Sequence, residues 1–347
     1  MRHIGKFKKA GCSVDLPEVF QRYRGEIVKE LVSIIGGSSL ALYDMMRYHL
    51  GWIDQQGHPE EGGGKLVRPT LLLLSCEAVG GDWRVALPAA AAVELVHNFS
   101  LIHDDIEDGD QERRHRATVW WLWGKPQAIN AGDAMHSLAG LALLRLDGKG
   151  VAPQKMLHAA HILDETCLEL CEGQYLDICY ENLFDINIDA YLEMIDRKTA
   201  ALISCSLQLG ALMGSEDETL VTRFRRFGRK LGLAYQMLDD VLGIWGGESA
   251  SDVQKKKKTL PVIYALKRAG GEERAALLRI YAKETISLED VDRVTQILGH
   301  LGTKEYTQEI ARKYYREALG ELEGANLSHQ ALKELKEVTS FLVEREY

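Results

Sequence analysis

Two clusters of carboxylates lie within stretches that otherwise have the pattern of apolar helices, and they constrain this chain more than any other feature. The first is Asp104-Asp105-Ile106-Glu107-Asp108, and the second is Asp239-Asp240. Burying a carboxylate costs free energy unless a cation or hydrogen-bond donors compensate it. In a helix Asp104 and Asp108 lie one turn apart on the same face. The pattern therefore predicts two helices whose carboxylates meet at an oxygen-rich site for a divalent cation.

Two other interpretations of these acids were weighed against the metal site. With a formal net charge of −9, acid pairs on solvated helix faces are ordinary in a chain like this one. A calcium-binding EF-hand loop beginning at Asp104 is excluded, because Ile106 and His115 stand where oxygen ligands are required. The basic residues that accompany the acids favour the metal site.

The rest of the chain predicts an all-α fold. Apolar residues recur mostly at helical spacing, alternating patterns are few, and only 7 of the 347 residues are proline. No Pro-, Gly- or Ser-rich linker divides the chain, so we expect one domain over residues 1–347, with a motif-bearing core at about 62–261 and C-terminal helices at 262–347. The expected helices are Glu18–Ile35, Leu40–Leu50, Pro69–Val79, Val85–Glu107, Pro126–Leu146, Pro153–Tyr180, Asp189–Leu212, Glu218–Trp245, Thr259–Lys267, Glu272–Lys283, Leu288–Leu301, Lys304–Glu323 and Gln330–Arg345.

Basic residues follow the acidic stretches and open another helix. Lys65 and Arg68 come directly after three glycines, at the start of an apolar helical run. A phosphate-binding loop of the nucleotide-hydrolase kind is excluded there, because Leu66 replaces the required Ser or Thr. The other basic candidates are Arg113, Arg114, Arg116, Lys198 and the run Lys255–Lys258. Cations beside acid-rich helices in an acidic protein indicate an anionic substrate that Arg, Lys and a metal bind together.

The order and spacing of several motifs resemble those of a known protein family. The motifs are Gly62-Gly63-Gly64-Lys65, Glu94 to Asp108, Arg113-Arg114, Trp123-Gly124, Ala128 to Asp133, Glu172-Gly173-Gln174, Arg197-Lys198-Thr199 and Gln236 to Asp240. In this order they resemble the trans-isoprenyl diphosphate synthases, or polyprenyl synthetases, from about Gly62 to Pro261 and more weakly on both sides. The resemblance implies an isoprenoid-synthase-type helical bundle around a deep central apolar cavity.

The resemblance also implies a reaction. A magnesium-dependent prenyltransferase of this family condenses isopentenyl diphosphate with an allylic diphosphate, here dimethylallyl, geranyl or farnesyl diphosphate. Metal ions and basic side chains would stabilise the leaving diphosphate as the allylic C–O bond ionises. The double bond of isopentenyl diphosphate would attack the cation, and the released diphosphate would take the proton. Apolar walls would keep water away from the cation.

Site roles follow from the resemblance, residue by residue. The expected catalytic residues are Asp104, Asp105, Asp108, Asp239 and Lys198. Three magnesium ions are expected with the allylic diphosphate, and their expected ligands are Asp104, Asp108 and Asp239. The residues expected to bind isopentenyl diphosphate are Lys65, Arg68, His97 and Arg114. Those expected to bind the allylic diphosphate are Arg113, Lys198, Thr199, Gln236, Asp240 and Lys257.

Product length is expected to depend on the helix that carries the first acidic cluster. Val96 and Ser100 precede Asp104 by two turns and one turn on the same row, and Phe99 lies beside them. Ser100 leaves room for a growing chain, whereas the Phe99 ring would close the passage. The resemblance then implies a C20 product, with C15 and C25 as the nearest alternatives. Phe99 as an ordinary packing residue is the competing interpretation.

The sequence departs from the family pattern at four places. Gly243 replaces the last Asp of the second acidic motif, His115 replaces the Gly after Arg-Arg, and Leu66 replaces an Arg. The loop over Gly246–Asp252 lacks the usual Gly-Lys, and a lost charge-assisted contact is worth roughly 1.5–3 kcal/mol. Two alternatives therefore stay open: a class I terpene cyclase on the same fold, and a non-catalytic partner subunit of a prenyl diphosphate synthase.

Location and partners are inferred from segments that the sequence lacks. The basic start Met1–Lys6 is not followed by an apolar core, which predicts no secretory signal, and no apolar run approaches the length of a membrane span. The six cysteines show no zinc-like or disulfide-like pattern, which favours a reducing cytoplasm. The Lys255–Lys258 run has no accompanying aromatic residues, so nucleic acid is not an expected partner. A homodimer is expected from the family.

Overall fold

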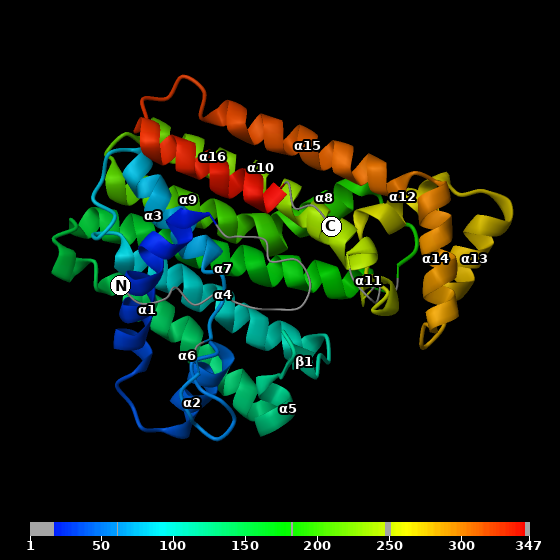
Figure 1. The fold of residues 1–347 in the computed structure, drawn as a ribbon, viewed down its shortest axis with the longest axis horizontal. Helices are drawn as coiled ribbons and strands as arrows, with labels where there is room; N and C mark the ends of the chain where they lie inside the picture. Colours follow the sequence, from blue (N-terminus) through cyan, green and yellow to red (C-terminus); the bar gives the residue numbers. More distant parts are fainter. Residues whose placement is uncertain (1–16, 61, 182, 247–250, 344–347) are drawn as a thin grey trace, which may run out of the picture.

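The computed structural model describes residues 17–60, 62–181, 183–246 and 251–343, and this part of the chain is almost entirely helical (Figure 1). The N-terminal half contains α1 (Glu18–Ile35), α2 (Ala41–His49), α3 (Val67–Ala78), α4 (Leu87–Glu107), the strands β1 (Glu112–Arg113) and β2 (Arg116–Ala117), α5 (Val119–Trp123), α6 (Lys125–Leu144) and the short 3₁₀ turn η1 (Asp147–Lys149). The middle contains α7 (Pro153–Tyr180), α8 (Ile188–Ile195), the π-helical turn η2 (Asp196–Ala200), α9 (Ala201–Gly214) and α10 (Glu218–Trp245). The C-terminal part contains α11 (Ser251–Gln254), α12 (Leu260–Arg268), α13 (Gly271–Tyr281), α14 (Leu288–His300), α15 (Thr303–Glu321) and α16 (His329–Val343).

Helices α3, α4, α9 and α10 form the centre of the bundle. Every residue of α4 from Leu87 to Val96 is buried, as expected for a helix that is apolar nearly all round. Helix α6 packs on α4, α9 packs on α3, and α10 packs on both α9 and α15. Glycines allow the closest approaches: a Cβ on Gly228 of α10 would lie only 2.5 Å from the Cα of Ser204 in α9. The all-α bundle expected from the sequence is confirmed.

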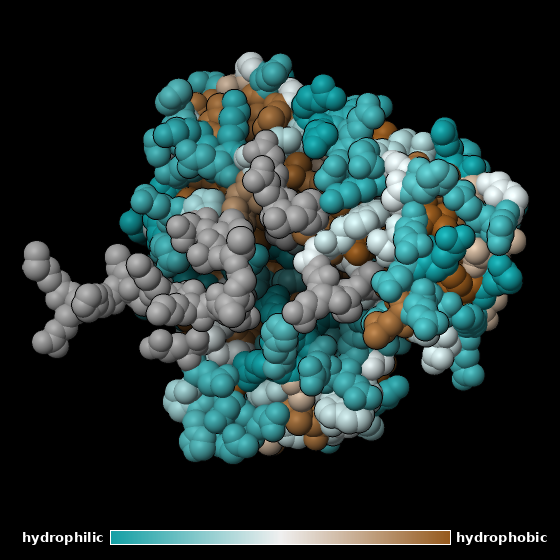
Figure 2. All heavy atoms as spheres, turned by 45° about the vertical axis from the view of Figure 1, so that its right-hand side comes forward, coloured by the Kyte–Doolittle hydropathy of each residue, from teal (hydrophilic) through white to brown (hydrophobic). Residues whose placement is uncertain are grey.

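A second apolar cluster lies at the other end of the molecule. It joins the end of α10 to α12, α13 and α14, through residues such as Ile244, Leu277 and Leu298. Helix α15 then returns along the bundle to α16, which packs on α3 (Figure 1). Most of the face seen in Figure 2 is hydrophilic, and apolar groups show as separate patches between polar ones. The division into a core and C-terminal helices within one domain stays a prediction.

The helix boundaries agree with the sequence to within a few residues, except in three places. The helix expected over Asp189–Leu212 is present but irregular, because the π turn at Asp196–Ala200 lies between α8 and α9. The short helices α5 and α11 and the β1–β2 hairpin were not expected. No helix among the described residues is long and apolar enough to span a membrane.

Candidate active site

The C-terminal end of α4 carries the first acidic cluster. Asp104 is partly buried there, and burial raises its pKa to about 6, with Lys198 opposing the shift and Asp108 adding to it. Burial likewise raises the pKa of Asp105 to about 6, although Arg113 opposes the rise by donating from Nε to Asp105 Oδ1 over 2.6 Å. The buried Oδ2 of Asp105 has no hydrogen-bond partner in the described protein. This end of α4 therefore carries carboxylate oxygen that the protein itself does not fully pair with hydrogen-bond donors or cations.

Asp240, in the second acidic cluster, points into the protein. Its Oδ2 accepts hydrogen bonds from the Tyr191 hydroxyl at 2.6 Å and the Leu260 amide at 3.0 Å. Its Oδ1 accepts from Gln236 Nε2 at 2.9 Å. Burial raises the pKa of Asp240 to about 7, and these three donors oppose the rise. Asp240 thus ties α8, α10 and α12 together, while its neighbour Asp239 is exposed on α10.

The π turn η2 carries the next expected residues. Thr199 donates from Oγ1 to Gln236 Oε1 over 2.7 Å, so η2 and α10 are linked at the site. Lys198 forms an ion pair with Asp177 of α7, and its charge also interacts with Asp104 and Asp108. A π-helical turn is uncommon and is often found at functional sites. Here it brings Lys198 toward the acids of α4.

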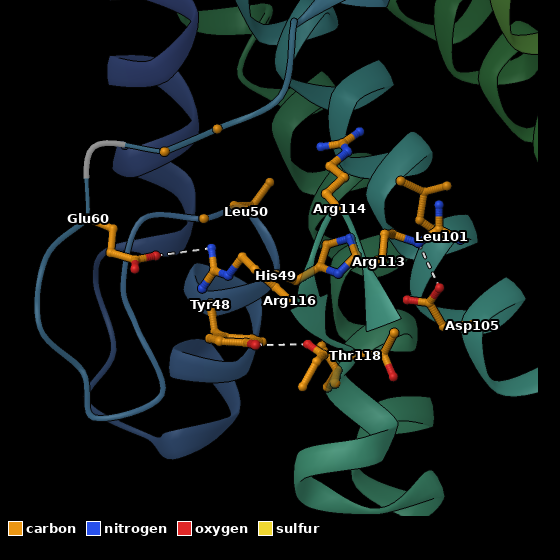
Figure 3. A pocket seen from close by; sticks show the side chains of 15 residues that line it. Tyr48, His49, Leu50, Glu60, Leu101, Asp105, Arg113, Arg114, Arg116 and Thr118 are labelled. Carbon is orange, nitrogen blue, oxygen red and sulfur yellow. Dashed lines mark hydrogen bonds and ion pairs between the residues drawn. The ribbon is translucent and has the colours of Figure 1, made fainter. Parts of the chain in front are cut away.

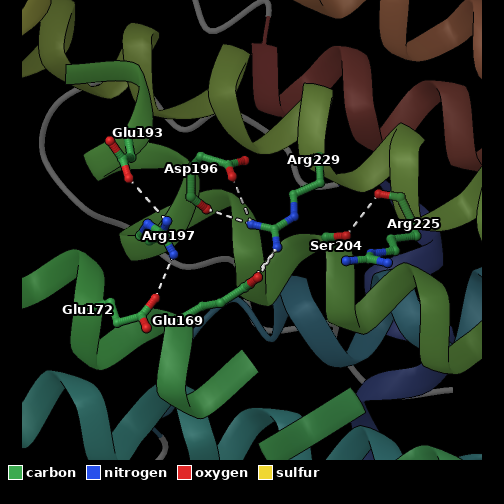
Figure 4. A network of polar contacts seen from close by, with 8 residues as sticks. All are labelled: Glu169, Glu172, Glu193, Asp196, Arg197, Ser204, Arg225 and Arg229. Atoms are coloured by element: carbon green, nitrogen blue, oxygen red, sulfur yellow. Dashed lines mark hydrogen bonds and ion pairs between the residues drawn. The ribbon is translucent and has the colours of Figure 1, made fainter. Parts of the chain in front are cut away.

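A network of ion pairs joins the π turn to α7 and α10 (Figure 4). Arg229 of α10 donates to the Asp196 carbonyl at 3.0 Å, to the Asp196 carboxylate at 3.1 Å and to Glu169 at 2.5 Å. A Cβ on Gly173 of α7 would lie 2.3 Å from the backbone nitrogen of Lys198, so only glycine permits this close packing of α7 on the π turn. The sequence indicated the Glu-Gly-Gln motif at Gly173 but not its role. The role of Arg229 was missed entirely, because an arginine 31 residues beyond Lys198 gives no local signal.

Basic residues approach the acids from a hairpin between α4 and α5. Arg113 and Arg116 are paired across the β1–β2 ladder, and the two turn residues Arg114 and His115 have φ of 54° and 61°. Positive φ at both turn positions is the geometry in which glycine or asparagine is normally found. His115 at the family's glycine position is thus accommodated as a strained turn rather than as a different loop.

This hairpin closes a cavity of about 370 Å³ against the end of α2 (Figure 3). Its polar lining consists of Tyr48, His49, Glu60, Asp105, Arg113, Arg114, Arg116 and Thr118. A smaller adjoining pocket shares His49 and Arg114 and adds Arg24, Glu94 and Asn98. Of the residues expected to bind isopentenyl diphosphate, Arg114 lines these cavities. His49 and Arg24 were not among the candidates, and the sequence offered only their helical context.

The remaining expected residues of this group lie at the start of α3 and on α4. Arg68 and the His97 ring nitrogen lie 3.2 Å apart, and Arg68 Nε has no partner in the described residues. Burial, reinforced by Arg68 and Arg114, holds the pKa of His97 well below its usual range. Lys65 is exposed, and its Nζ lies 5.9 Å from the centre of the Phe341 ring in α16. Leu66, between Lys65 and α3, has a φ of 54°.

The lysine run after α11 is divided between different partners. Lys257 Nζ lies 3.9 Å from Asp108, and Lys255 binds Asp110 at 2.6 Å, so both reach the end of α4. Lys258 instead donates to the Glu181 carbonyl at 2.6 Å, and burial lowers its pKa to about 8. Lys257 thus lies beside the first acidic cluster and its role stays a prediction, whereas Lys258 is structural. The sequence departure at 247–250 lies outside the described residues.

Gly243 has a physical role that the sequence did not reveal. A Cβ at this position would lie 2.0 Å from Oδ2 of Asp252, which belongs to α11. The Asp252 carboxylate therefore occupies the space above the second acidic helix that a side chain at 243 would need. Its charge interacts with Asp239 and with Lys257. Asp252 brings a carboxylate to the face from which the third motif aspartate is missing.

The three residues expected to set product length lie on α4. Phe99 is buried and packs edge-on against His103 and against His136 of α6, with ring centres 5.9 and 5.0 Å apart. Val96 is buried, and Ser100 donates to the His97 carbonyl. The Phe99 ring thus lies toward α6, and the deep apolar cavity and its floor stay predictions.

The donor chemistry of the acidic helices fits magnesium. Among the described residues no three His, Cys, Asp or Glu side chains already form a metal-binding group. The available side-chain oxygens include two buried ones without partners, Asp105 Oδ2 on α4 and Gln174 Oε1 on the neighbouring helix α7. Magnesium prefers such hard ligands and retains water and substrate phosphates as further ligands. A site completed by water and diphosphate is consistent with this geometry.

Comparisons with known proteins agree with the sequence motifs. Residues 56–298 match the polyprenyl synthetase family. The (2E,6E)-farnesyl diphosphate synthase of Mycobacterium tuberculosis is 36% identical over 312 residues, which cover 87% of this chain and 86% of that protein. The geranylgeranyl diphosphate synthase of the same species is 38% identical over 316 residues, which cover 88% and 89%. The crystal structure of a polyprenyl synthetase from Streptomyces coelicolor matches with a TM-score of 0.87 at 35% identity, over 94% of this chain and 98% of that one.

Proposed function

This chain belongs to the polyprenyl synthetase family, and we propose that it binds its allylic diphosphate between α4 and α10 and its isopentenyl diphosphate in the arginine-lined cavity. It is a trans-prenyltransferase that forms a short-chain prenyl diphosphate. The observation that supports the proposal most is the Arg113–Asp105 ion pair, because it joins the acidic helix to the basic cavity. Two diphosphates bound on its two sides would lie next to each other, as a condensation requires.

The allylic diphosphate is proposed to meet basic side chains from three elements. Lys198 is directed toward Asp104 and Asp108 by the π turn, and Lys257 lies near Asp108 from the opposite side. Gln236 and Thr199 are hydrogen bonded to each other beside them. The polyprenyl synthetase family is magnesium-dependent. Three ions held by Asp104, Asp108 and Asp239 would neutralise charge on the leaving diphosphate. Lys198, Lys257 and Arg113 would stabilise the same developing charge.

Isopentenyl diphosphate is proposed to lie against the other set of cations. Arg68 and Arg114 would supply charge-assisted hydrogen bonds, and Lys65 would approach from the start of α3. His97 is neutral in this basic surrounding, so it can donate one hydrogen bond without adding charge. A second diphosphate site of this kind distinguishes a condensing enzyme from a terpene cyclase, which ionises a single diphosphate. The presence of all the acids of the first motif, of Asp239 and Asp240, and of Asp252 likewise favours an active enzyme over a non-catalytic subunit.

We propose a C20 product, with C15 and C25 as the alternatives. The relatives that match include both farnesyl and geranylgeranyl diphosphate synthases, so the comparisons leave the length open. Phe99→Ala tests the proposed floor. If Phe99 closes the passage, chromatography of the dephosphorylated products will show longer chains than the unmodified protein gives. An unchanged product would assign the floor to another helix.

We further propose a cytoplasmic homodimer. Large apolar side chains are exposed on α6 and α7: Leu144, Leu157, Leu168 and Tyr175 are between 61% and 71% exposed. A second copy packed on these helices would cover them. Light scattering on the purified protein at several concentrations will show the dimer or a monomer.

One incubation separates the candidate activities. The purified protein is mixed with magnesium, labelled isopentenyl diphosphate and each of dimethylallyl, geranyl and farnesyl diphosphate. Label incorporated into a longer diphosphate supports condensation and identifies the primer. A cyclic hydrocarbon formed without incorporation would identify a cyclase, and no turnover with any primer would support the non-catalytic subunit.

A further inference from the structure

His49 occupies the centre of the basic cavity without any role in the family motifs. It is the last residue of α2, and Figure 3 shows its ring among Arg113, Arg114 and Arg116 of the hairpin. It lines both the cavity of about 370 Å³ and the smaller pocket beside it. The ring is therefore within the space that the proposed function gives to isopentenyl diphosphate.

The end of α2 is fixed against the hairpin. The Tyr48 hydroxyl donates to the Ala117 carbonyl at 2.8 Å, and the Arg116 guanidinium lies 4.4 Å from the centre of the Tyr48 ring. Arg116 also donates to the Ile53 carbonyl at 2.8 Å. These contacts position the neighbouring His49 without using its ring. The His49 ring itself lines the cavity.

Asn98 lies beside this ring as a hydrogen-bond partner. The Asn98 amide nitrogen donates to the Glu94 carbonyl at 2.7 Å and to Glu94 Oε1 at 3.1 Å, so the Asn98 oxygen remains to accept from His49. Burial, followed by the charges of Arg113, Arg114 and Arg116, lowers the pKa of His49 to about 3. The lowered pKa favours the neutral ring, which carries one N–H donor and one lone pair.

A diphosphate entering this cavity reverses that electrostatic balance. Its negative charges offset the three arginines, and its oxygens need donors rather than a lone pair. We propose that His49 is a further binding residue for isopentenyl diphosphate, and that it takes up a proton as the diphosphate binds. The doubly protonated ring then donates to Asn98 on one side and to a diphosphate oxygen on the other. This inference rests on the proposed placement of isopentenyl diphosphate.

Other charged groups face this cavity and must be separated from His49 in a test. From α1, α4, the loop before α3 and the hairpin, they are Arg24, Glu60, Glu94, His97, Asp105, Arg113, Arg114 and Arg116. His97 and Asp105, whose pKa burial raises to about 6, can also change protonation as the diphosphate binds. The other groups and the diphosphate itself also exchange protons on binding. Their contribution cancels when the proton uptake of the unmodified protein is compared with that of a variant changed only at His49.

The test is calorimetric titration of isopentenyl diphosphate into the whole protein with EDTA and without primer, in two buffers of different ionisation enthalpy. His49→Gln keeps a hydrogen-bond donor but cannot be protonated. On binding isopentenyl diphosphate, His49→Gln should take up fewer protons than the unmodified protein, by a fraction of a proton. It should also bind isopentenyl diphosphate about tenfold more weakly, because a charge-assisted contact becomes a neutral one. The affinity of the unmodified protein should fall as the pH rises, and that of His49→Gln should fall less.

His58→Gln is the matched control, because His58 is an exposed histidine outside the cavity lining. Unchanged proton uptake or unchanged affinity in His49→Gln would overturn the inference. Arg114→Ala separates this from a failure of the proposed function. If Arg114→Ala also binds isopentenyl diphosphate normally, the substrate lies elsewhere, whereas weak binding by Arg114→Ala alone would leave the site intact and exclude only His49. An unchanged KM for the allylic substrate in His49→Gln will show that the fold is retained.

Discussion

The acidic and basic sides of this active site are built in different ways. The acids stand on regular helices, α4 and α10, whose backbone is in its preferred conformation. Several of the cations stand on or beside turns: among the described residues the non-glycine positions with positive φ are Leu66, Arg114, His115 and Lys256. Each of these is itself basic or directly adjoins a basic residue of the site. The helices supply fixed carboxylates, and strained turns carry part of the cations that surround them, while Arg68 lies on α3 and Lys198 on η2.

The difference has an electrostatic reason. Carboxylates one helical turn apart repel each other, and a rigid helix holds them together until a cation compensates them. Cations must instead come from several directions around a diphosphate, and no single helix face provides that. A strained backbone position costs about 1 kcal/mol or more and persists only where its surroundings impose it. Here Arg24 holds the glycine loop through the Gly64 carbonyl at 2.9 Å, and Tyr48 holds the hairpin.

The acidic side should give the largest effect on turnover. Asp104→Asn keeps the size of the side chain but removes a charge from the proposed metal site. We expect turnover to fall by at least about a hundredfold, with the helix content unchanged, because stabilisation of the leaving group is lost. Asp292→Asn on α14 is the matched control and should retain most activity, since Asp292 is exposed and lies outside the two acidic clusters. Turnover of Asp104→Asn within a few-fold of the unmodified protein would contradict the metal assignment.

The basic side should affect one substrate selectively. Arg68→Ala removes a charge-assisted contact worth roughly 1.5–3 kcal/mol, so the KM for isopentenyl diphosphate should rise about tenfold or more. The KM for the allylic primer should change little. Lys65→Ala should act in the same direction and more weakly, because Lys65 is exposed. Equal effects on both substrates in steady-state kinetics would mean that the two pockets have been assigned wrongly.

The second acidic helix can be tested at Gly243. Gly243→Asp restores the family's usual residue, yet its Cβ would lie 2.0 Å from Asp252 Oδ2 and must displace that carboxylate. We expect activity to fall about tenfold and the magnesium requirement to rise, since two acids would compete for one position. Adding Asp252→Ala to Gly243→Asp should recover much of the loss. A double variant that is worse than either single variant would show that Asp252 has a different task.

The sequence predicted the regular parts of this site better than the irregular ones. Apolar periodicity and the acid clusters led to α4 and α10 nearly residue by residue, because those signals are local. The π turn at Lys198 depends on Arg229, which is distant in the chain, and on Gly173 of another helix. His49 and Asp252 were missed for the same reason. The roles of a histidine at the end of a helix and of an aspartate after a loop depend on residues that are distant in the sequence and that only the fold brings next to them.

The smallest predicted effect also compares the two sides most directly. Replacement by glycine should change the free energy of unfolding in opposite directions on the hairpin turn and on the acidic helix α10. His115→Gly relieves a left-handed backbone position, since glycine adopts positive φ without a steric cost. Part of the gain is lost to the greater freedom of glycine in the unfolded chain, which leaves a stabilisation of about 0.5 kcal/mol. Arg226→Gly at an exposed position of α10 should instead destabilise by about 1 kcal/mol, because glycine is a poor helix former. Denaturant unfolding of both variants measures the two signs, and destabilisation by His115→Gly would mean that the hairpin turn is not strained.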